Sequence, residues 1–124
     1  MAKKAPDAMI DASLDYVAQA DGIMVCSAEP ADYTAAYTTL KMAGSSALTT
    51  ASYTIDDAAG GGRKVTVAAT SGLSIDVSTA ATHIALVSTG DTTLRYVTTC
   101  TSQELTSGVT VDIPAWIITI GDPT

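Results

Sequence analysis

The spacing of the apolar residues changes once along the chain, and this change constrains the fold more than any other feature. Beyond Thr49, apolar and polar residues alternate, for example from 73 to 78 and again from 109 to 113. Alternating side chains face opposite sides of a strand, so these runs predict half-buried β-strands. Several short strands separated by turn signals, without βαβ alternation, predict a mainly β fold: an antiparallel β-sandwich or a barrel-like domain.

Before this change, the apolar residues follow a helical period. Ile10, Leu14 and Val17 recur at the spacing of one helix face, and Gly22 ends the pattern. A helix this short is marginal in water by itself, so it must dock either on its own sheet or on a neighbouring copy. We therefore treat these three residues as a candidate oligomer or partner interface.

The length allows one domain. At 124 residues a chain buries roughly two-thirds of its unfolded surface, and a second core is not expected. We divide the sequence into an N-terminal helical segment, 1–22, and a single β-rich domain, 23–124. The short α-helix would thus be an appendage of the β-domain.

Individual strands and turns can be placed from residue types. Residues 82–88 and 93–101 are rich in β-branched residues and flank a Ser-Thr-Gly-Asp turn, which predicts a hairpin. Residues 23–26 predict a first strand. The segment 29–44 is ambiguous, because its Pro, Asp and Gly suit helix ends while its Thr and Tyr favour a strand. We expect a short helix or an ordered loop there.

The triple glycine Gly60–Gly62 precedes Arg63 and Lys64, which raises the question of a phosphate-binding loop. Such a loop needs a following helix whose terminus faces the phosphates, whereas here the basic pair leads directly into Val-Thr-Val. We therefore expect a hairpin loop, with Asp56 and Asp57 facing the basic pair across it.

Charge and hydropathy exclude two kinds of partner. The net charge of −7 repels nucleic-acid phosphates, and the six Lys and Arg residues form no basic patch. No apolar run approaches the roughly 18 to 20 residues of a membrane-spanning helix. Aspartates interrupt the N-terminal region, so a secretory signal is not expected. Nucleic acid and membrane are therefore not expected partners.

Catalytic and metal-binding patterns are also missing. His83 is the sole histidine, and no nucleophile-elbow or paired-carboxylate arrangement accompanies it. Cys26 and Cys100 lack zinc-ligand spacing, and the sequence leaves open whether they are buried thiols or a disulfide. We expect no catalytic residues, no cofactor and no metal.

Three aromatic residues remain as candidate contacts. Trp116 shares one face of the last strand with Ile118 and Ile120. This favours packing in the core or in a subunit interface over a sugar-stacking role. Tyr33 and Tyr37, four residues apart, would cover a flank of the sheet or an intersubunit seam.

Two stretches carry a resemblance to a known class of proteins. The segment "ATHIALVSTGDTTLRYVTTCTSQELTSGVTVDIPAWIITIGDP" is similar to a module of small virion structural proteins of tailed bacteriophages, in which a polar turn with Gly leads into a final Ile-Pro-Ala stretch. The N-terminal stretch "DAMIDASLDYVAQADGIMVCSAEPADY" also resembles phage proteins encoded among structural genes.

This resemblance implies a non-enzymatic virion protein assembled in the bacterial host cytoplasm. It implies most directly a capsid decoration, or cement, protein that forms a homo-oligomer and binds the major capsid protein on the head surface. Two alternatives remain: a tail or fibre accessory module with an adhesive or receptor-binding role, and a small hydrolase that uses His83.

Overall fold

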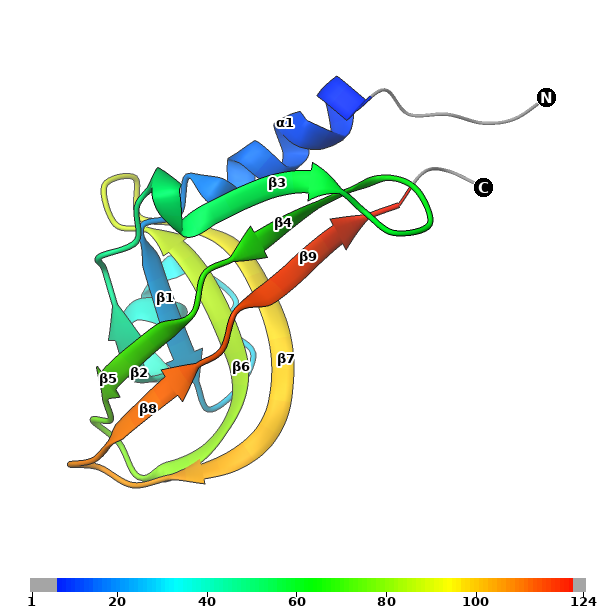
Figure 1. Ribbon diagram of the computed structural model, residues 1–124. Coiled ribbons are helices and arrows are strands. Elements are labelled where there is room, and N and C mark those ends of the chain that lie inside the picture. The colour runs from blue at the N-terminus through cyan, green and yellow to red at the C-terminus, as the bar shows by residue number, and fades with distance from the viewer. Residues whose placement is uncertain (1–6, 122–124) are drawn as a thin grey trace.

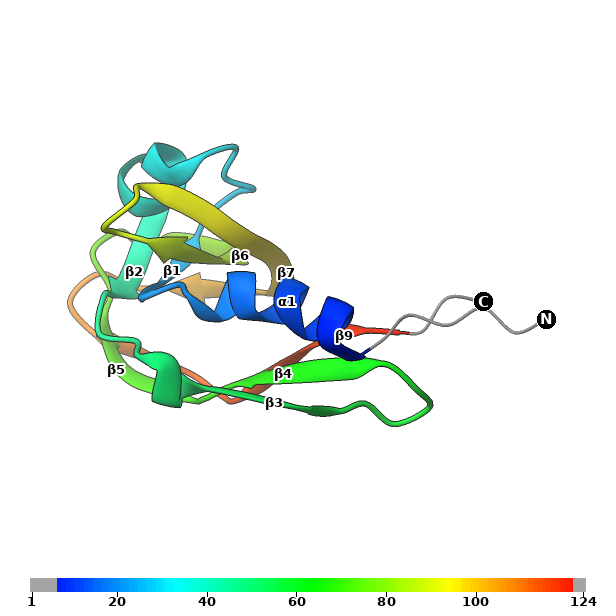
Figure 2. The same cartoon turned by 90° about the horizontal axis from the view of Figure 1, so that it is seen from above.

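Two antiparallel β-layers with a helix between them make up the fold in the computed structural model, which describes residues 7–121 (Figures 1 and 2). This confirms the expected mainly β class with a short N-terminal α-helix. The elements are α1 (Asp7–Ala18), β1 (Gly22–Cys26), η1 (Ala35–Thr39), β2 (Lys41–Ser45), η2 (Thr50–Ser52), β3 (Tyr53–Asp57), β4 (Arg63–Val67), β5 (Thr70–Ser74), β6 (Thr79–Ser88), β7 (Thr93–Leu105), β8 (Thr110–Ile113) and β9 (Trp116–Ile120).

The first layer is one sheet with the strand order β2-β1-β6-β7. Its largest part is the β6–β7 hairpin, in which Ile84 lies opposite Thr98. The predicted hairpin is confirmed, and both strands extend further than the β-branched runs alone indicated. Strand β1 is buried along its whole length, because the inner core covers one face and the short helix η1 packs on the other.

The second layer consists of two small sheets, β3-β4-β9 and β5-β8. The chain runs from β4 into β5 and from β8 into β9. The strand pairing is interrupted at the same level in both connections. Val67 pairs with Trp116 above the break, and Thr70 pairs with Ile113 below it. Pro114 lies in this break, as expected of a residue that cannot donate to a strand ladder.

The two layers are joined along one side only. A bridge between Ala43 and Ile75 and a hydrogen bond from the Asp76 amide to the Met42 carbonyl, 2.7 Å long, link β2 to the second layer. On the other side, β7 ends the first layer while β8 and β9 end the second, and no strand pairs with these edges among residues 7–121. The sandwich is therefore open along that side.

Helix α1 fills one end of the space between the layers (Figure 2). Ile10, Leu14 and Val17 are buried there and belong to the same apolar core as the inner residues of both layers. Of the two docking modes that the sequence allowed, the helix uses its own sheets. These three side chains are enclosed by their own chain, so they offer no surface to a partner in this structure.

Polar contacts fix the end of the helix. The Tyr53 hydroxyl donates to the Ala20 carbonyl at 2.8 Å, and Arg95 donates to the Tyr16 carbonyl at 3.2 Å while its guanidinium lies 4.4 Å from the centre of the Tyr16 ring. Asp21 accepts two hydrogen bonds from Thr89, at 2.9 Å from the amide and 2.6 Å from the hydroxyl. The helical segment and the β-strands therefore form one structural unit.

The segment 29–44, where a short helix or an ordered loop was expected, contains a helical turn and also a strand. A single π-helical turn, η1, is followed directly by strand β2. The sequence alone does not indicate this strand, because Lys41–Ser45 has no alternation of apolar and polar residues. Its pairing with β1 and the burial of Met42 and Ala43 stabilise it as a strand.

The triple glycine is a hairpin loop between β3 and β4, as predicted. Gly60–Gly62 all have positive φ angles of 82° to 106°, a region that favours glycine. At Gly62 a Cβ atom would lie 2.2 Å from the Ile120 carbonyl oxygen. Arg63 binds Asp57 across the loop at 2.7 Å and reaches Asp11 of α1 at 2.8 Å, so the loop also anchors the helix.

A candidate binding cleft between two strand edges

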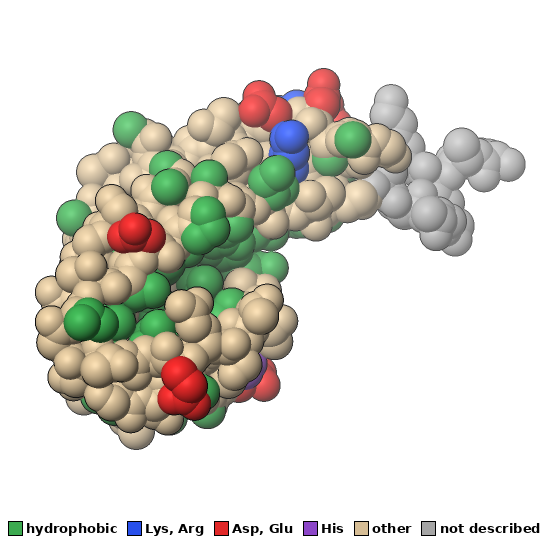
Figure 3. Space-filling view, turned by 60° about the horizontal axis from the view of Figure 1, so that its bottom comes forward, with side chains coloured by type: hydrophobic (Ala, Val, Ile, Leu, Met, Phe, Trp, Pro, Cys, Tyr) green, Lys and Arg blue, Asp and Glu red, His purple; other side chains and the backbone are tan. Residues whose placement is uncertain are grey.

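An apolar cleft opens where the two layers are not joined. It has a volume of about 380 Å³ and lies between the second half of β7 and the edge formed by β8 and β9. Figure 3 shows a hollow on this face with apolar side chains gathered in it. The floor belongs to the core itself: Val25, Ala81, Leu105 and Ile113 are buried, and Ile84 is partly exposed.

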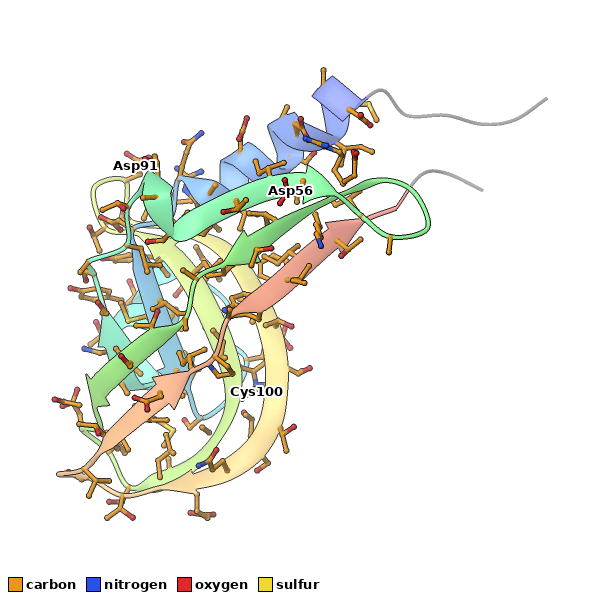
Figure 4. All side chains as sticks on the ribbon, viewed as in Figure 1. Asp56, Asp91 and Cys100 are labelled. Atoms are coloured by element: carbon orange, nitrogen blue, oxygen red, sulfur yellow. The ribbon has the colours of Figure 1, made fainter. Side chains whose placement is uncertain are left out.

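The walls come from the two facing strand edges. Strand β7 contributes Thr98, Cys100 and Gln103, and the other edge contributes Val111 and Trp116. Cys100 lies near the middle of β7 (Figure 4). Because alternate residues of β7 face inward, the hydroxyl and thiol groups of this wall meet the apolar floor.

Two aromatic rings limit the cleft at the end nearer α1. Tyr96 of β7 and Trp116 of β9 lie with their ring centres 6.1 Å apart and their planes tilted by 33°. This contact joins the two open edges. Beyond it, towards β8, the edges separate and the cleft begins.

Trp116 brings an unpaired polar atom to this place. Its indole Nε1–H is buried and has no hydrogen-bond partner among the described residues. A buried donor without an acceptor costs about 1 to 3 kcal/mol, so such groups are rare in folded proteins.

The cleft has one carboxylate and no basic group in its lining. Asp112 is exposed and accepts a hydrogen bond from the Gly72 amide at 2.8 Å. Glu104, next to the lining residues of β7, is exposed as well. The end of the cleft farther from α1 is therefore negatively charged.

The strand edges also present backbone groups. Strand β7 pairs only with β6, strand β9 only with β4 and strand β8 only with β5, within residues 7–121. About half of the amide and carbonyl groups of an edge strand point away from its sheet. The cleft thus has an apolar floor between two rows of hydrogen-bonding groups.

The two cysteines lie on opposite faces of the first layer and are not bonded. Cys26 is fully buried on the outer face beneath η1, where burial raises the pKa of its thiol to about 11. Cys100 lines the cleft on the inner face, and burial also raises its pKa. Both thiols are therefore protonated near neutral pH, and the disulfide that the sequence left open is not formed.

His83 is outside the cleft. Its Nδ1 lies 2.8 Å from the hydroxyl of Thr82, and its backbone is opposite Cys26 and Thr99 on the neighbouring strands. In the described part of the chain, no three His, Cys, Asp or Glu side chains are grouped as a metal site. Residues 7–121 also include no helix that is long and apolar enough to cross a membrane.

The predicted contact residues fall into three separate places. Ile10, Leu14 and Val17 are in the core, and Trp116 lines the cleft. Tyr33 and Tyr37 stack on the outer face of the first layer, with ring centres 5.2 Å apart and planes at 14°, and they cover the small cluster around Cys26. The structure does not bring these six residues together.

Sequence reasoning missed most of the cleft. It treated Cys100 only as a thiol and Ile84 and Val111 only as strand residues. The available signal was Pro114, which cannot donate to a strand ladder and therefore indicates an edge, a bulge or a bend in the last strand region. Alternation identifies the inward side of each strand, but it does not tell which two edges remain unpaired.

Comparisons with protein-family models, with curated proteins and with solved structures find no match to this chain.

Proposed function

We propose that this protein is a non-enzymatic structural protein that attaches to a larger assembly through the cleft between β7 and β8–β9. The observation that carries this proposal is the lining: apolar floor residues, hydroxyl groups, one carboxylate and one protonated thiol. Such a lining provides burial and hydrogen bonding for a partner. It provides no pair of groups arranged to move a proton or to attack a bond.

We further propose that the assembly is the virion of a tailed bacteriophage, with the protein as a decoration protein on the major capsid protein of the head. The resemblance of residues 81–123 to small virion proteins supports this step. In that setting many copies on one particle act together, so a cleft of modest size gives sufficient attachment. A homo-oligomer would add to the same effect, and it would have to form through surface other than the buried face of α1.

The test is the copy number of the protein in purified particles of the phage that encodes it, measured by quantitative mass spectrometry against the major capsid protein. Abundance of the same order as the capsid protein is the expected result. A few copies per particle would move the protein to the tail, and absence from the particle would end the virion proposal.

A second measurement examines the attachment itself. Purified protein is added to particles that lack it, and the bound fraction is determined by sedimentation. We expect saturable binding that a bulky side chain in the cleft, Cys100→Trp, reduces at least about tenfold. The matched control is Thr54→Trp, which adds the same side chain at an exposed position of β3 outside the lining.

A tail or fibre module with an adhesive role is the second candidate. The observation that favours it is the Tyr33–Tyr37 stack, which is partly exposed and has the Lys41 ammonium 5.7 Å from the Tyr37 ring centre. Paired rings beside a cation suit sugar or receptor contacts. Binding to a glycan array that Tyr33→Ala abolishes and Trp116→Phe leaves unchanged would favour this role over the cleft.

A further inference from the structure

We propose that the occupant of the cleft is an extended peptide strand of a partner protein, which pairs with the open edge of β7 and covers the exposed part of the core. This inference deepens the proposed function, on which it rests, by naming how the partner is held. The segment would have apolar side chains at alternate positions and Lys or Arg at the end near Asp112. The following observations lead to this occupant.

The first observation is the pair of unpaired edges. A strand added to β7 would continue the sheet β2-β1-β6-β7 and would satisfy backbone groups that now lack a strand partner among residues 7–121. β7 borders the cleft from Thr98 to Leu105. At about 3.3 Å per residue, this length matches a partner segment of roughly six to eight residues.

The second observation is the character of the two surfaces that such a strand would meet. Its inward side chains would lie over Val25 and Ile84, which are apolar, and its outward side chains would face solvent. A strand has this division by geometry, because successive side chains point to opposite faces. A partner carbonyl near Trp116 would also provide the acceptor that the indole N–H lacks.

The third observation is charge. The lining includes Asp112 and no Lys, Arg or His, and Glu104 is exposed beside it. A second copy of this chain would bring a net charge of −7 to an already acidic place. A basic flank on a different protein fits the charge, so we assign the occupant to a partner and not to a second copy.

The experiment uses the full chain and needs no knowledge of the partner. A library of random 12-residue peptides displayed on particles is panned against the wild-type protein, and enriched sequences are screened against Cys100→Trp and the matched control Thr54→Trp. Trp116 is the only tryptophan of the wild type, so its fluorescence reports occupation of the wild-type cleft without a label, while isothermal titration calorimetry measures the affinities of the variants. Circular dichroism establishes that each variant is folded.

We expect enriched peptides with apolar residues at alternate positions and a basic end. Their affinity should fall at least about tenfold in Cys100→Trp and change less than about twofold in Thr54→Trp. Glu104→Gln should weaken them a few-fold at low salt and not at high salt, because an exposed charge is screened.

Strand pairing itself is tested by N-methylation of one enriched peptide at alternate backbone positions, in the two possible phases. The phase that removes the amides facing β7 should weaken binding at least about tenfold, while side chains stay the same. Binding that neither phase changes would mean that the cleft takes an apolar ligand without pairing, and the inference would be wrong.

Three other results would also overturn the inference. These are no enriched peptide, enriched peptides that bind Cys100→Trp as well as wild type, or a wild-type dimer in light scattering that is a monomer in Cys100→Trp. These failures are separable from a failure of the proposed function. If particles still bind Cys100→Trp normally, the protein attaches to the virion by another surface. If particles never bind the wild type while peptides do, the strand site stands and the virion assignment fails.

Discussion

The space between the two β-layers is closed at one end and open at the other. At one end α1 inserts three buried apolar side chains, and hydrogen bonds from Tyr53 and Arg95 hold the helix end. At the other end the floor of Val25 and Ile84 is left without a cover between two unpaired edges. The difference separates a part of the core that stabilises the fold from a part that is available for binding. Substitutions at the two ends should therefore have different consequences.

The largest effect is expected at the closed end. Leu14→Ala removes a side chain that is 0% exposed, and the resulting cavity should lower the free energy of unfolding by about 2 to 5 kcal/mol. Urea denaturation measures this. Met9→Ala is the control, since Met9 is on the same helix and 59% exposed, and it should change stability by less than about 0.5 kcal/mol. Equal effects of the two substitutions would show that α1 is not part of the core.

A smaller loss is expected for the hydrogen bond at the helix end. Tyr53→Phe removes the donor to the Ala20 carbonyl and should cost about 0.5 to 1.5 kcal/mol. Burial, and secondarily the charge of Asp21, raise the pKa of Tyr53 to about 12. The wild-type advantage over Tyr53→Phe should thus persist through neutral pH and decline only as the pH rises above about 10. Tyr37→Phe, on the partly exposed outer face, is the matched control.

The hydrogen bonds to Asp21 should make part of the free energy of unfolding depend on pH in the acidic range. The Thr89 hydroxyl, with a further contribution from the Thr89 amide, lowers the pKa of Asp21 below its usual value of 3.8. A carboxylate with a lowered pKa stabilises the folded state above about pH 4, and this contribution is lost as the pH falls through the folded-state pKa.

Denaturation curves between pH 2 and pH 6 compare wild type with Asp21→Asn. The variant should be less stable than wild type at pH 6, and the difference between their free energies of unfolding should be smaller at pH 2. The difference in stability between wild type and Thr89→Val should likewise be smaller at pH 2 than at pH 6. A gap that stays constant over this range would contradict the assignment of the lowered pKa to these bonds.

The smallest effect is expected at the open end. Cys100→Ala changes a wall that contacts little protein, so stability should change by less than about 0.5 kcal/mol. The same variant should lose the only readily alkylated thiol, because Cys26 is fully buried. Mass spectrometry after treatment with N-ethylmaleimide should find one adduct in folded wild type and none in Cys100→Ala. A stability loss as large as that of Leu14→Ala would mean that the two ends do not differ.

Much of the fold could be predicted from the sequence because its signals are local. The spacing of Ile10, Leu14 and Val17 gave the helix, the alternation at 109–113 gave β8, and the turn at 88–91 gave the β6–β7 hairpin. The alternation at 73–78 was less accurate, because β5 is Thr70–Ser74 and ends before most of it. Strand β2 was not recognised, since Lys41–Ser45 becomes a strand through its pairing with β1. The apolar face of α1 was correctly identified, but spacing does not tell whether a buried face meets its own chain or another.

The cleft was less predictable for a related reason. Trp116 was singled out from its strand face, and it does line the cleft. The other walls depend on which strands end each layer, and this follows from pairings between residues far apart, such as Arg63 with Ile120. No local pattern contains that information.

The pairing of β9 with β4 has a consequence for how the protein is made. The β6–β7 hairpin joins neighbours in sequence and can close while synthesis continues, whereas β4, which also pairs with β3, gains its second partner only when residues 116–120 have left the ribosome. Until then the side of β4 that will pair with β9 is an open strand edge. The edges of β4 and β7 are therefore both open while the chain is being synthesised, and both could pair with the strands of a neighbouring nascent chain.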